Sequence, residues 1–202
     1  MSLFALSSAH ALSSAELQRF LDEALKSEKG SEVVIPPGRH ELEKPLVIRD
    51  AHKLLIAGLD ADTTILLPKT TAFELHGKCE SVLIRKLTIE GGTTALVADD
   101  VTGLRVERCF FPNQSAACIT LKNAAESQIQ DCTLRDGGGS SGILLEKCRE
   151  VQVRHLFIAR MQAAVQLKDS KNCRVEQNDF LSCAEAVIGQ LGGHRVADNE
   201  SR

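Results

Sequence analysis

Charged and acid–base side chains recur at a regular interval through the second half of this sequence. Six of them form a candidate catalytic set, which comprises Arg105, Glu107, Arg108, Asp131, Arg154 and His155. An arginine beside a carboxylate can bind an anionic sugar, and an arginine or histidine can then abstract a proton. Glu107 and Asp131 can also supply oxygen ligands to calcium. The set is typical of polysaccharide lyase, glycoside hydrolase or epimerase chemistry.

The same residues allow an interpretation without catalysis, because they fall in columns when the chain is aligned on its repeat. One column contains Arg85, Glu107, Gln130, Arg154 and Glu176, and the next contains Lys86, Arg108, Asp131, His155, Gln177 and Asp198. Opposite charges on neighbouring strands stabilise pairing by about 0.2–1 kcal/mol. A third column, Asp99, Lys122, Glu146, Lys168 and Gln190, alternates in sign at each charged step. That alternation favours structural charge ladders.

The sequence predicts no metal site and no cofactor. Its cysteines and histidines show none of the close pairings that zinc sites use. Asp131, with Glu107 and Arg108, comes closest to a calcium site, but it offers few oxygens for an ion that takes six or more. Calcium therefore enters only under the lyase hypothesis.

Composition limits the partners that the chain can take. Its 202 residues carry a formal charge of −3, which lacks the basic excess of a nucleic-acid-binding protein. No apolar run is long enough to cross a membrane.

Trp and Tyr are absent, so a glycan groove lacks its usual aromatic platforms. Phe110 and Phe157 are expected to point outward, as a candidate interface with a polysaccharide or protein partner.

The positions of these side chains follow from an internal repeat. One column holds Ile84, Val106, Ile129, Val153, Val175 and Val196, at intervals of 22, 23, 24, 22 and 21 residues. Further columns of apolar residues keep the same register, and Asn178 and Asn199 continue one of them. Short strand-like runs at this period are typical of a parallel β-helix. The sequence therefore predicts an all-β, right-handed parallel β-helix of about 6–7 rungs.

The first part of the chain has a different period. Residues 13–26 place Leu17, Leu21 and Leu25 on one face of an amphipathic helix, and Ser13 with Glu16 has capping-box spacing. We expect residues 1–30 to form an N-terminal segment with this capping helix and residues 31–202 to form the β-helix. The last repeat stops partway, which predicts a solenoid truncated at its C-terminal end or covered by end-to-end self-association.

The sequence has seven cysteines and no Cys-x-x-Cys pair. We interpret them as buried free thiols, with Cys109 and Cys132 stacked one rung apart in the same inward column. Stacked Asn178 and Asn199 are expected to hydrogen-bond the backbone at a corner. Free thiols favour a reducing compartment.

The chain resembles the pectin-lyase-like right-handed β-helices with CASH-type repeats. The resemblance lies in the opening helix, the segment Glu32-Val-Val-Ile-Pro-Pro-Gly-Arg-His-Glu-Leu42, and rungs such as Val175-Glu-Gln-Asn178-Asp-Phe180 and Gly142-Ile-Leu-Leu145. It implies the architecture and favours secretion, which leaves the compartment open. Asp99-Asp100 is similar to the paired aspartates of family-28 polygalacturonases, but the other motifs of that family are missing.

Two functional hypotheses follow, because one fold carries many functions. The first is a non-catalytic binding or scaffold module for an anionic glycan or a protein. The missing Trp and Tyr and the alternating charges favour it. The alternative is a lyase, hydrolase or epimerase that acts on acidic polysaccharide through the candidate catalytic set.

Overall fold

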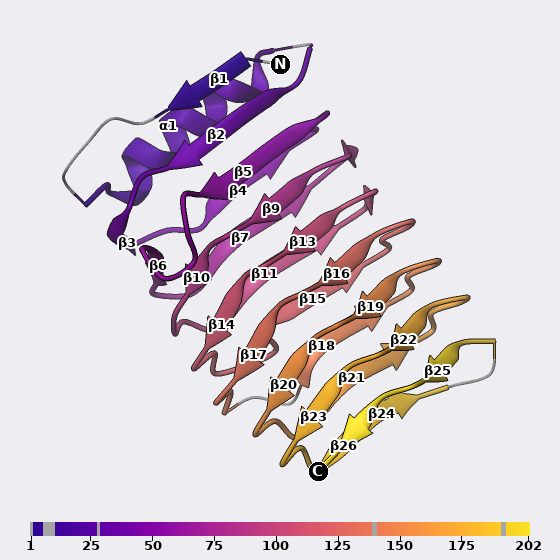
Figure 1. Cartoon of the computed structure of the whole chain (residues 1–202). Coiled ribbons are helices and arrows are strands. Elements are labelled where there is room, and N and C mark those ends of the chain that lie inside the picture. Colours follow the sequence, from indigo (N-terminus) through magenta and orange to yellow (C-terminus); the bar gives the residue numbers. More distant parts are fainter. Residues whose placement is uncertain (1, 6–10, 28, 139–140, 191–192) are drawn as a thin grey trace.

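The chain folds into a parallel β-solenoid, shown by a computed structural model that describes residues 2–5, 11–27, 29–138, 141–190 and 193–202. Three long sheets run along its axis, and the chain visits them in turn on every rung (Figure 1). Neighbouring strands run parallel in each sheet. The predicted fold class is confirmed.

The strands are short, and each sheet takes one per rung. Sheet A contains β1 (Ser2–Ala5), β2 (Ser31–Ile35), β5 (Leu54–Gly58), β9 (Leu83–Arg85), β13 (Arg105–Glu107), β16 (Gln128–Gln130), β19 (Gln152–Arg154), β22 (Arg174–Glu176) and β25 (Arg195–Ala197). Sheet B contains β3 (Gly38–Leu42), β6 (Thr64–Pro68), β10 (Thr88–Ile89), β14 (Phe110–Pro112), β17 (Thr133–Arg135), β20 (Phe157–Ala159), β23 (Asp179–Leu181) and β26 (Glu200–Ser201). Sheet C contains β4 (Leu46–Arg49), β7 (Thr71–His76), β11 (Thr94–Asp99), β15 (Ile119–Lys122), β18 (Ser141–Glu146), β21 (Ala163–Lys168) and β24 (Glu185–Gly189), and β8 (Cys79–Glu80) pairs with β12 (Val101–Thr102).

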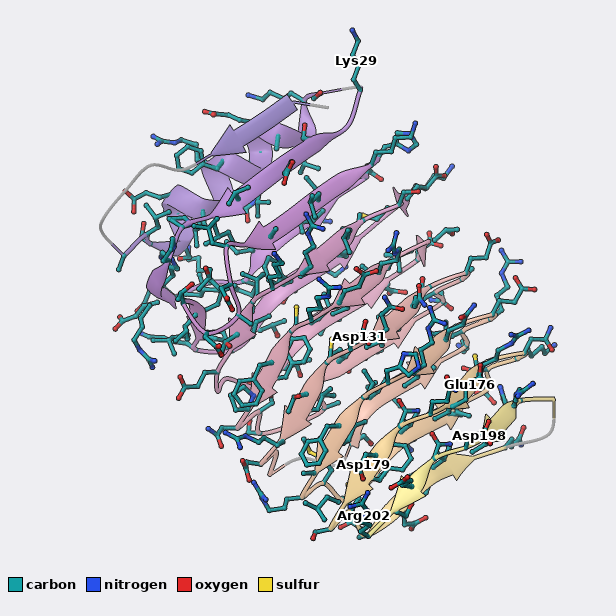
Figure 2. The ribbon with its side chains drawn as sticks, viewed as in Figure 1. Lys29, Asp131, Glu176, Asp179, Asp198 and Arg202 are labelled. Carbon is teal, nitrogen blue, oxygen red and sulfur yellow. The ribbon has the colours of Figure 1, made fainter. Side chains whose placement is uncertain are left out.

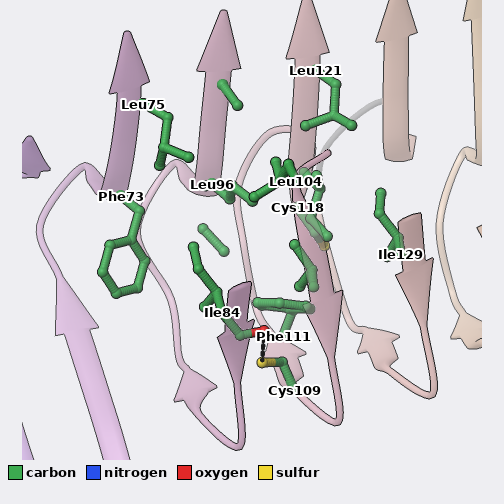
Figure 3. Close-up of a cluster of buried hydrophobic side chains, with 14 of the residues drawn as sticks. Phe73, Leu75, Ile84, Leu96, Leu104, Cys109, Phe111, Cys118, Leu121 and Ile129 are labelled. Atoms are coloured by element: carbon green, nitrogen blue, oxygen red, sulfur yellow. Dashed lines mark hydrogen bonds between the residues drawn. The ribbon is translucent and has the colours of Figure 1, made fainter. Parts of the chain in front are cut away.

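The inward columns form one continuous core. Val106 pairs in register with Ile84 on one side and Ile129 on the other, as the repeat predicts. Phe111 is buried between the sheets, and Leu96 and Leu121 of sheet C pack toward the same interior (Figure 3). Because strands alternate their side chains, the same register fixes which residues face outward.

Helix α1 (Ser14–Leu25) covers the first rung. Its capping box is confirmed, since the Ser13 hydroxyl accepts from the Glu16 N–H and the Glu16 carboxylate accepts from the Ser13 N–H. Leu17 and Leu21 are buried against the open end of the core. The side-chain amide of Gln18 accepts from the Val47 N–H at 2.7 Å and donates to the Val47 carbonyl at 2.8 Å. Because β4 is the edge strand of sheet C, this side chain makes the hydrogen bonds that a neighbouring strand would otherwise make. Strand β1, which the sequence did not predict, does the same for β2.

Tight corners join the sheets on every rung. Twenty non-glycine residues adopt positive φ angles in the described part of the chain, and most lie at these corners. The corner between sheets A and B is formed by Lys86, Arg108, Asp131, His155, Gln177 and Asp198, with φ between 52° and 59°. This column, which was expected only to face outward, is therefore the bend itself. Left-handed backbone costs an ordinary residue roughly 1–2 kcal/mol, so packing elsewhere must compensate.

The inward residue after several of these bends stabilises the corner. Asn178 Oδ1 accepts from the Leu156 N–H at 3.0 Å, and its Nδ2 donates to the Val153 carbonyl at 3.0 Å. Asn199 repeats this arrangement one rung later, which confirms the predicted asparagine stack. Cys132 occupies the same column, and its Sγ lies 3.4 Å from the Cys109 nitrogen. At other corners the hydroxyl groups of Ser127 and Ser170 accept hydrogen bonds from the equivalent N–H groups. Asparagine, serine and cysteine thus share the role of hydrogen-bonding a corner N–H of the preceding rung.

The charge ladder of sheet C is only partly as expected. Asp99, Lys122, Glu146 and Lys168 are paired in register on successive strands. However, these four described side chains form no ion pair with one another within 4 Å. Asp99 accepts instead from the Asn123 side chain at 2.8 Å. Exposed carboxylates and ammonium groups gain little from direct contact, because water solvates each of them.

Replacing Asn178 tests the role of the corner side chain. Asn178→Ala leaves the buried Leu156 N–H without its acceptor and removes a donor from the Val153 carbonyl, and we expect the free energy of unfolding to fall by about 1–3 kcal/mol. Asn178→Ser should lose less, because serine fills this role at other corners. Urea denaturation of both variants measures the difference, and equal losses would contradict the shared role.

Thiol reactivity tests the interior. Burial raises the pKa of the Cys118 thiol to about 12 and that of Cys148 to about 11. Six of the seven thiols are buried, and Cys183 is half-buried. At pH 8 a disulfide-exchange reagent should therefore label at most Cys183 in the folded chain and all seven in denaturant. Because the thiols of Cys118 and Cys148 ionise near 9.0 when unfolded and stay protonated there in the folded chain, the free energy of unfolding should fall above pH 9. Rapid labelling of several native thiols, or unchanged stability at pH 10, would refute this account.

Candidate functional site

The candidate catalytic residues lie along the bend between sheets A and B. Arg105, Glu107 and Arg154 project from the outer face of sheet A. Arg108, Asp131 and His155 form successive members of the corner column. Successive rungs stand about 4.8 Å apart, so the structure places the set on one edge and spreads it over three rungs.

Most of these groups are held by neighbours. The Arg105 guanidinium contacts the Glu107 carboxylate, and Arg154 donates to Gln130 Oε1 at 2.9 and 3.2 Å. His155 lies between two corner residues, with Nδ1 3.7 Å from Asp131 Oδ1 and Nε2 3.0 Å from Gln177 Oε1. A proton on Nε2 satisfies the Gln177 contact, whereas Nδ1 of this neutral tautomer carries a lone pair and can pair with the Asp131 carboxylate only when it is also protonated. Gln177 thus orients the neutral His155 ring from one side.

A hollow of about 560 Å³ opens next to His155 on the outer face of sheet B. We name it the corner hollow. Its side chains come from the last three rungs and include His155, Phe157, Gln177, Asp179, Asp198, Glu200 and Arg202. Figure 2 shows Asp179, Asp198 and Arg202 gathered at this end of the solenoid, with Asp131 nearer its middle.

The floor of the hollow is one outward column. Phe157 pairs in register with Asp179, and Asp179 pairs with Glu200. The three side chains therefore project in the same direction at steps of about 4.8 Å. Phe157 is half-buried and offers an apolar face. The Asp179 Oδ1 atom is buried without a hydrogen-bond partner in the described structure.

The hollow is acidic. Asp179, Asp198 and Glu200 line it, with Arg202 as the nearby cation. The hydrogen bond with Glu200 and the charge of Asp179 raise the pKa of Arg202. The carboxylates and the amide of Gln177 are acceptors suited to hydroxyl groups.

The two outward phenylalanines differ in their surroundings. The guanidinium of Arg135 lies 4.8 Å from the centre of the Phe110 ring and covers it. Phe157 instead borders the corner hollow. Both are half-buried, so the expected outward direction is confirmed, while a role as interface stays a prediction.

Sequence reasoning missed Asp179 and Glu200. Both stand one position after the corner asparagines Asn178 and Asn199, where the column of Phe110 and Phe157 continues. Extending that column through the last two rungs would have found them. Among the residues that the structure describes, no three His, Cys, Asp or Glu side chains gather as a metal site. No helix in the described ranges has the length and apolar content to span a membrane.

Solved structures with the same architecture include a viral protein and bacterial proteins named as an α-1,3-glucanase and a DFA-IIIase. The ORF18 protein of Geobacillus virus E2 matches with a TM-score of 0.70 and 13% identity over 86% of this chain and 41% of its own. The GH87 α-1,3-glucanase catalytic unit of Streptomyces thermodiastaticus matches with a TM-score of 0.65 and 13% identity over 96% of this chain and 46% of its own. The DFA-IIIase of Arthrobacter chlorophenolicus matches with a TM-score of 0.72 and 13% identity over 98% of this chain and 68% of its own.

At these identities the likeness concerns the fold alone, and this chain spans less than half of the viral protein and of the glucanase. No curated protein matches it. The family model described as "right handed beta helix region" matches residues 63–200. Since that match covers more than half of the sequence, the chain belongs to the right-handed β-helix family.

Proposed function

We propose that this chain is a carbohydrate-binding β-helix that takes a neutral sugar chain in the corner hollow. The observation that carries the proposal is the placement of Phe157 beside Asp179 and Glu200 on three successive rungs. An apolar ring face can pack against the C–H face of a sugar, while carboxylates accept hydrogen bonds from its hydroxyl groups. His155 and Gln177 border the same space.

The charge of the hollow selects the kind of sugar. Asp179, Asp198 and Glu200 repel uronate or sulfate groups at short range. A neutral glycan meets no such repulsion, and its hydroxyl groups supply the donors that these acceptors need. The anionic glycan expected from the sequence therefore does not suit this hollow.

Hydrolysis is the second candidate function. Asp179 and Glu200 are direct partners on adjacent strands, so their backbones stand about 4.8 Å apart. Carboxyl groups about 5–5.5 Å apart serve retaining glycosidases, one as nucleophile and one as acid and base. The structural neighbours named as an α-1,3-glucanase and a DFA-IIIase support carbohydrate chemistry on this architecture.

Sugar binding can be tested on the two outward phenylalanines. We expect Phe157→Ala to weaken binding of neutral glucan oligosaccharides about tenfold, which corresponds to about 1.4 kcal/mol of lost ring contact. Phe110→Ala is the matched control, because that ring lies in the same column but outside the hollow. Isothermal titration with nigerose and longer α-1,3-glucans measures both. Equal loss in the two variants, or no binding by the unaltered chain, would reject the proposal.

Hydrolysis is tested separately, by measuring the release of reducing ends. If the second candidate is correct, the chain releases reducing ends from a neutral glucan, and Asp179→Asn or Glu200→Gln lowers kcat by at least 100-fold while the oligosaccharide still binds. Asp169→Asn, at a corner away from the hollow, should leave the rate unchanged. Tight binding without product would restrict the function to binding.

A further inference from the structure

The outer face of sheet C is open along most of the solenoid. Helix α1 meets this sheet at its β4 edge, through the contact of Gln18 with Val47, at the N-terminal end (Figure 1). The connections that lead into the later strands are short, since residues 160–162 join β20 to β21 and residues 182–184 join β23 to β24. The outward side chains of this sheet are therefore accessible to a partner.

One outward column of this face is a ladder of charges without ion pairs. Its members come from four successive strands and are Asp99, Lys122, Glu146 and Lys168. Among the described residues, none of the four lies within 4 Å of an oppositely charged group. Both lysines are exposed. Two positive and two negative charges are thus available to a molecule that covers the face.

The neighbouring outward column supplies apolar surface. It runs in register and consists of Val97, Thr120, Leu144, Gln166 and Ile188. All five side chains are half-buried by their neighbours in the sheet. Covering apolar surface that water still reaches is favourable by about 25 cal/mol per Å². This column can give a contact its affinity, while the charges beside it decide the orientation of the partner.

The order of the charges makes the face complementary to itself. From β11 to β21 the signs run minus, plus, minus, plus, and in the opposite direction they run plus, minus, plus, minus. A two-fold axis parallel to the strands, midway between β15 and β18, turns a second copy end over end and lays its sheet C on this one. Lys122 then faces Glu146 of the second copy, and Asp99 faces its Lys168.

A parallel arrangement lacks this match. A two-fold axis along the solenoid would keep the rungs level, so Lys122 would face Lys122 of the second copy, and like charges at an interface are costly. The adjoining bend contains Asp100, Lys147 and Asp169. There the chain turns away from the plane of the sheet, and the three side chains are exposed at its rim. The ladder therefore selects the antiparallel arrangement.

We propose that sheet C is the interface of a homodimer in which two copies of this chain pack face to face with antiparallel solenoid axes. Seven strands of up to six residues form the face. Strand spacings of about 4.8 Å and residue spacings of about 3.3 Å give it roughly 670 Å², near the roughly 800 Å² per partner of standard interfaces. Aromatic anchors are missing from the two columns, so we expect a micromolar dimer. The corner hollow on sheet B stays open.

Sedimentation equilibrium measures the dimer directly. Lys122→Glu and Glu146→Lys should each weaken dimerisation about tenfold or more, because each places like charges across the two-fold axis. An equimolar mixture of the two variants should dimerise again, since one copy then presents two carboxylates where the other presents two ammonium groups. Lys86→Glu, at the bend between sheets A and B, is the matched control and should change the Kd less than about twofold. Unchanged melting temperatures would establish that all variants are folded.

Three outcomes would overturn the proposal: a monomer at every concentration, an equal loss in Lys86→Glu, or a mixture no more dimeric than its two components. Oligomers that keep growing with concentration would also contradict it, because they indicate end-to-end association. The inference is independent of sugar binding, and nigerose titration of the same samples separates failure of this interface from failure of the corner hollow.

Discussion

A hydrogen bond from a corner N–H group to a side chain of the next rung is the interaction that stabilises the bends of this fold. The left-handed residue turns the chain sharply, and at several corners a side chain one rung later accepts from the N–H of the inward residue that follows. Asn178, Asn199 and Cys132 accept it between sheets A and B, and Ser127 accepts it before sheet A. Since an unpaired buried N–H costs about 1–3 kcal/mol, these side chains help to hold the rungs in register, although the same column also contains Leu87 and Leu156.

This register has functional consequences, because it aligns outward side chains into columns. Arg154, His155 and Phe157 lie within four residues of one another, yet the bend directs Arg154 to the outer face of sheet A and Phe157 to the corner hollow. One corner thus separates the outward side chains of sheet A from the acidic hollow on sheet B.

The sequence predicted the architecture because inward residues must be apolar on every rung, so the period is visible at Ile84, Val106 and Ile129. It did not predict that Asp131 and His155 form the bend, because charged side chains rarely signal left-handed backbone. The sequence predicted the register of Asp99 with Lys122. It did not predict that their charged groups form no ion pair, because that depends on how well water solvates each group. Asp179 was not predicted, because its charge is isolated in a column that begins with Phe110 and Phe157, and the hollow forms only where three strands of sheet B lie together.

The position of the sugar site is tested most directly by NMR mapping of backbone amides during titration with nigerose. Nigerose should shift the amides of β20, β23 and β26 around Phe157 and leave the amides of β18, β21 and β24 on sheet C unshifted. Shifts centred on sheet C, or no shift at all, would contradict the account.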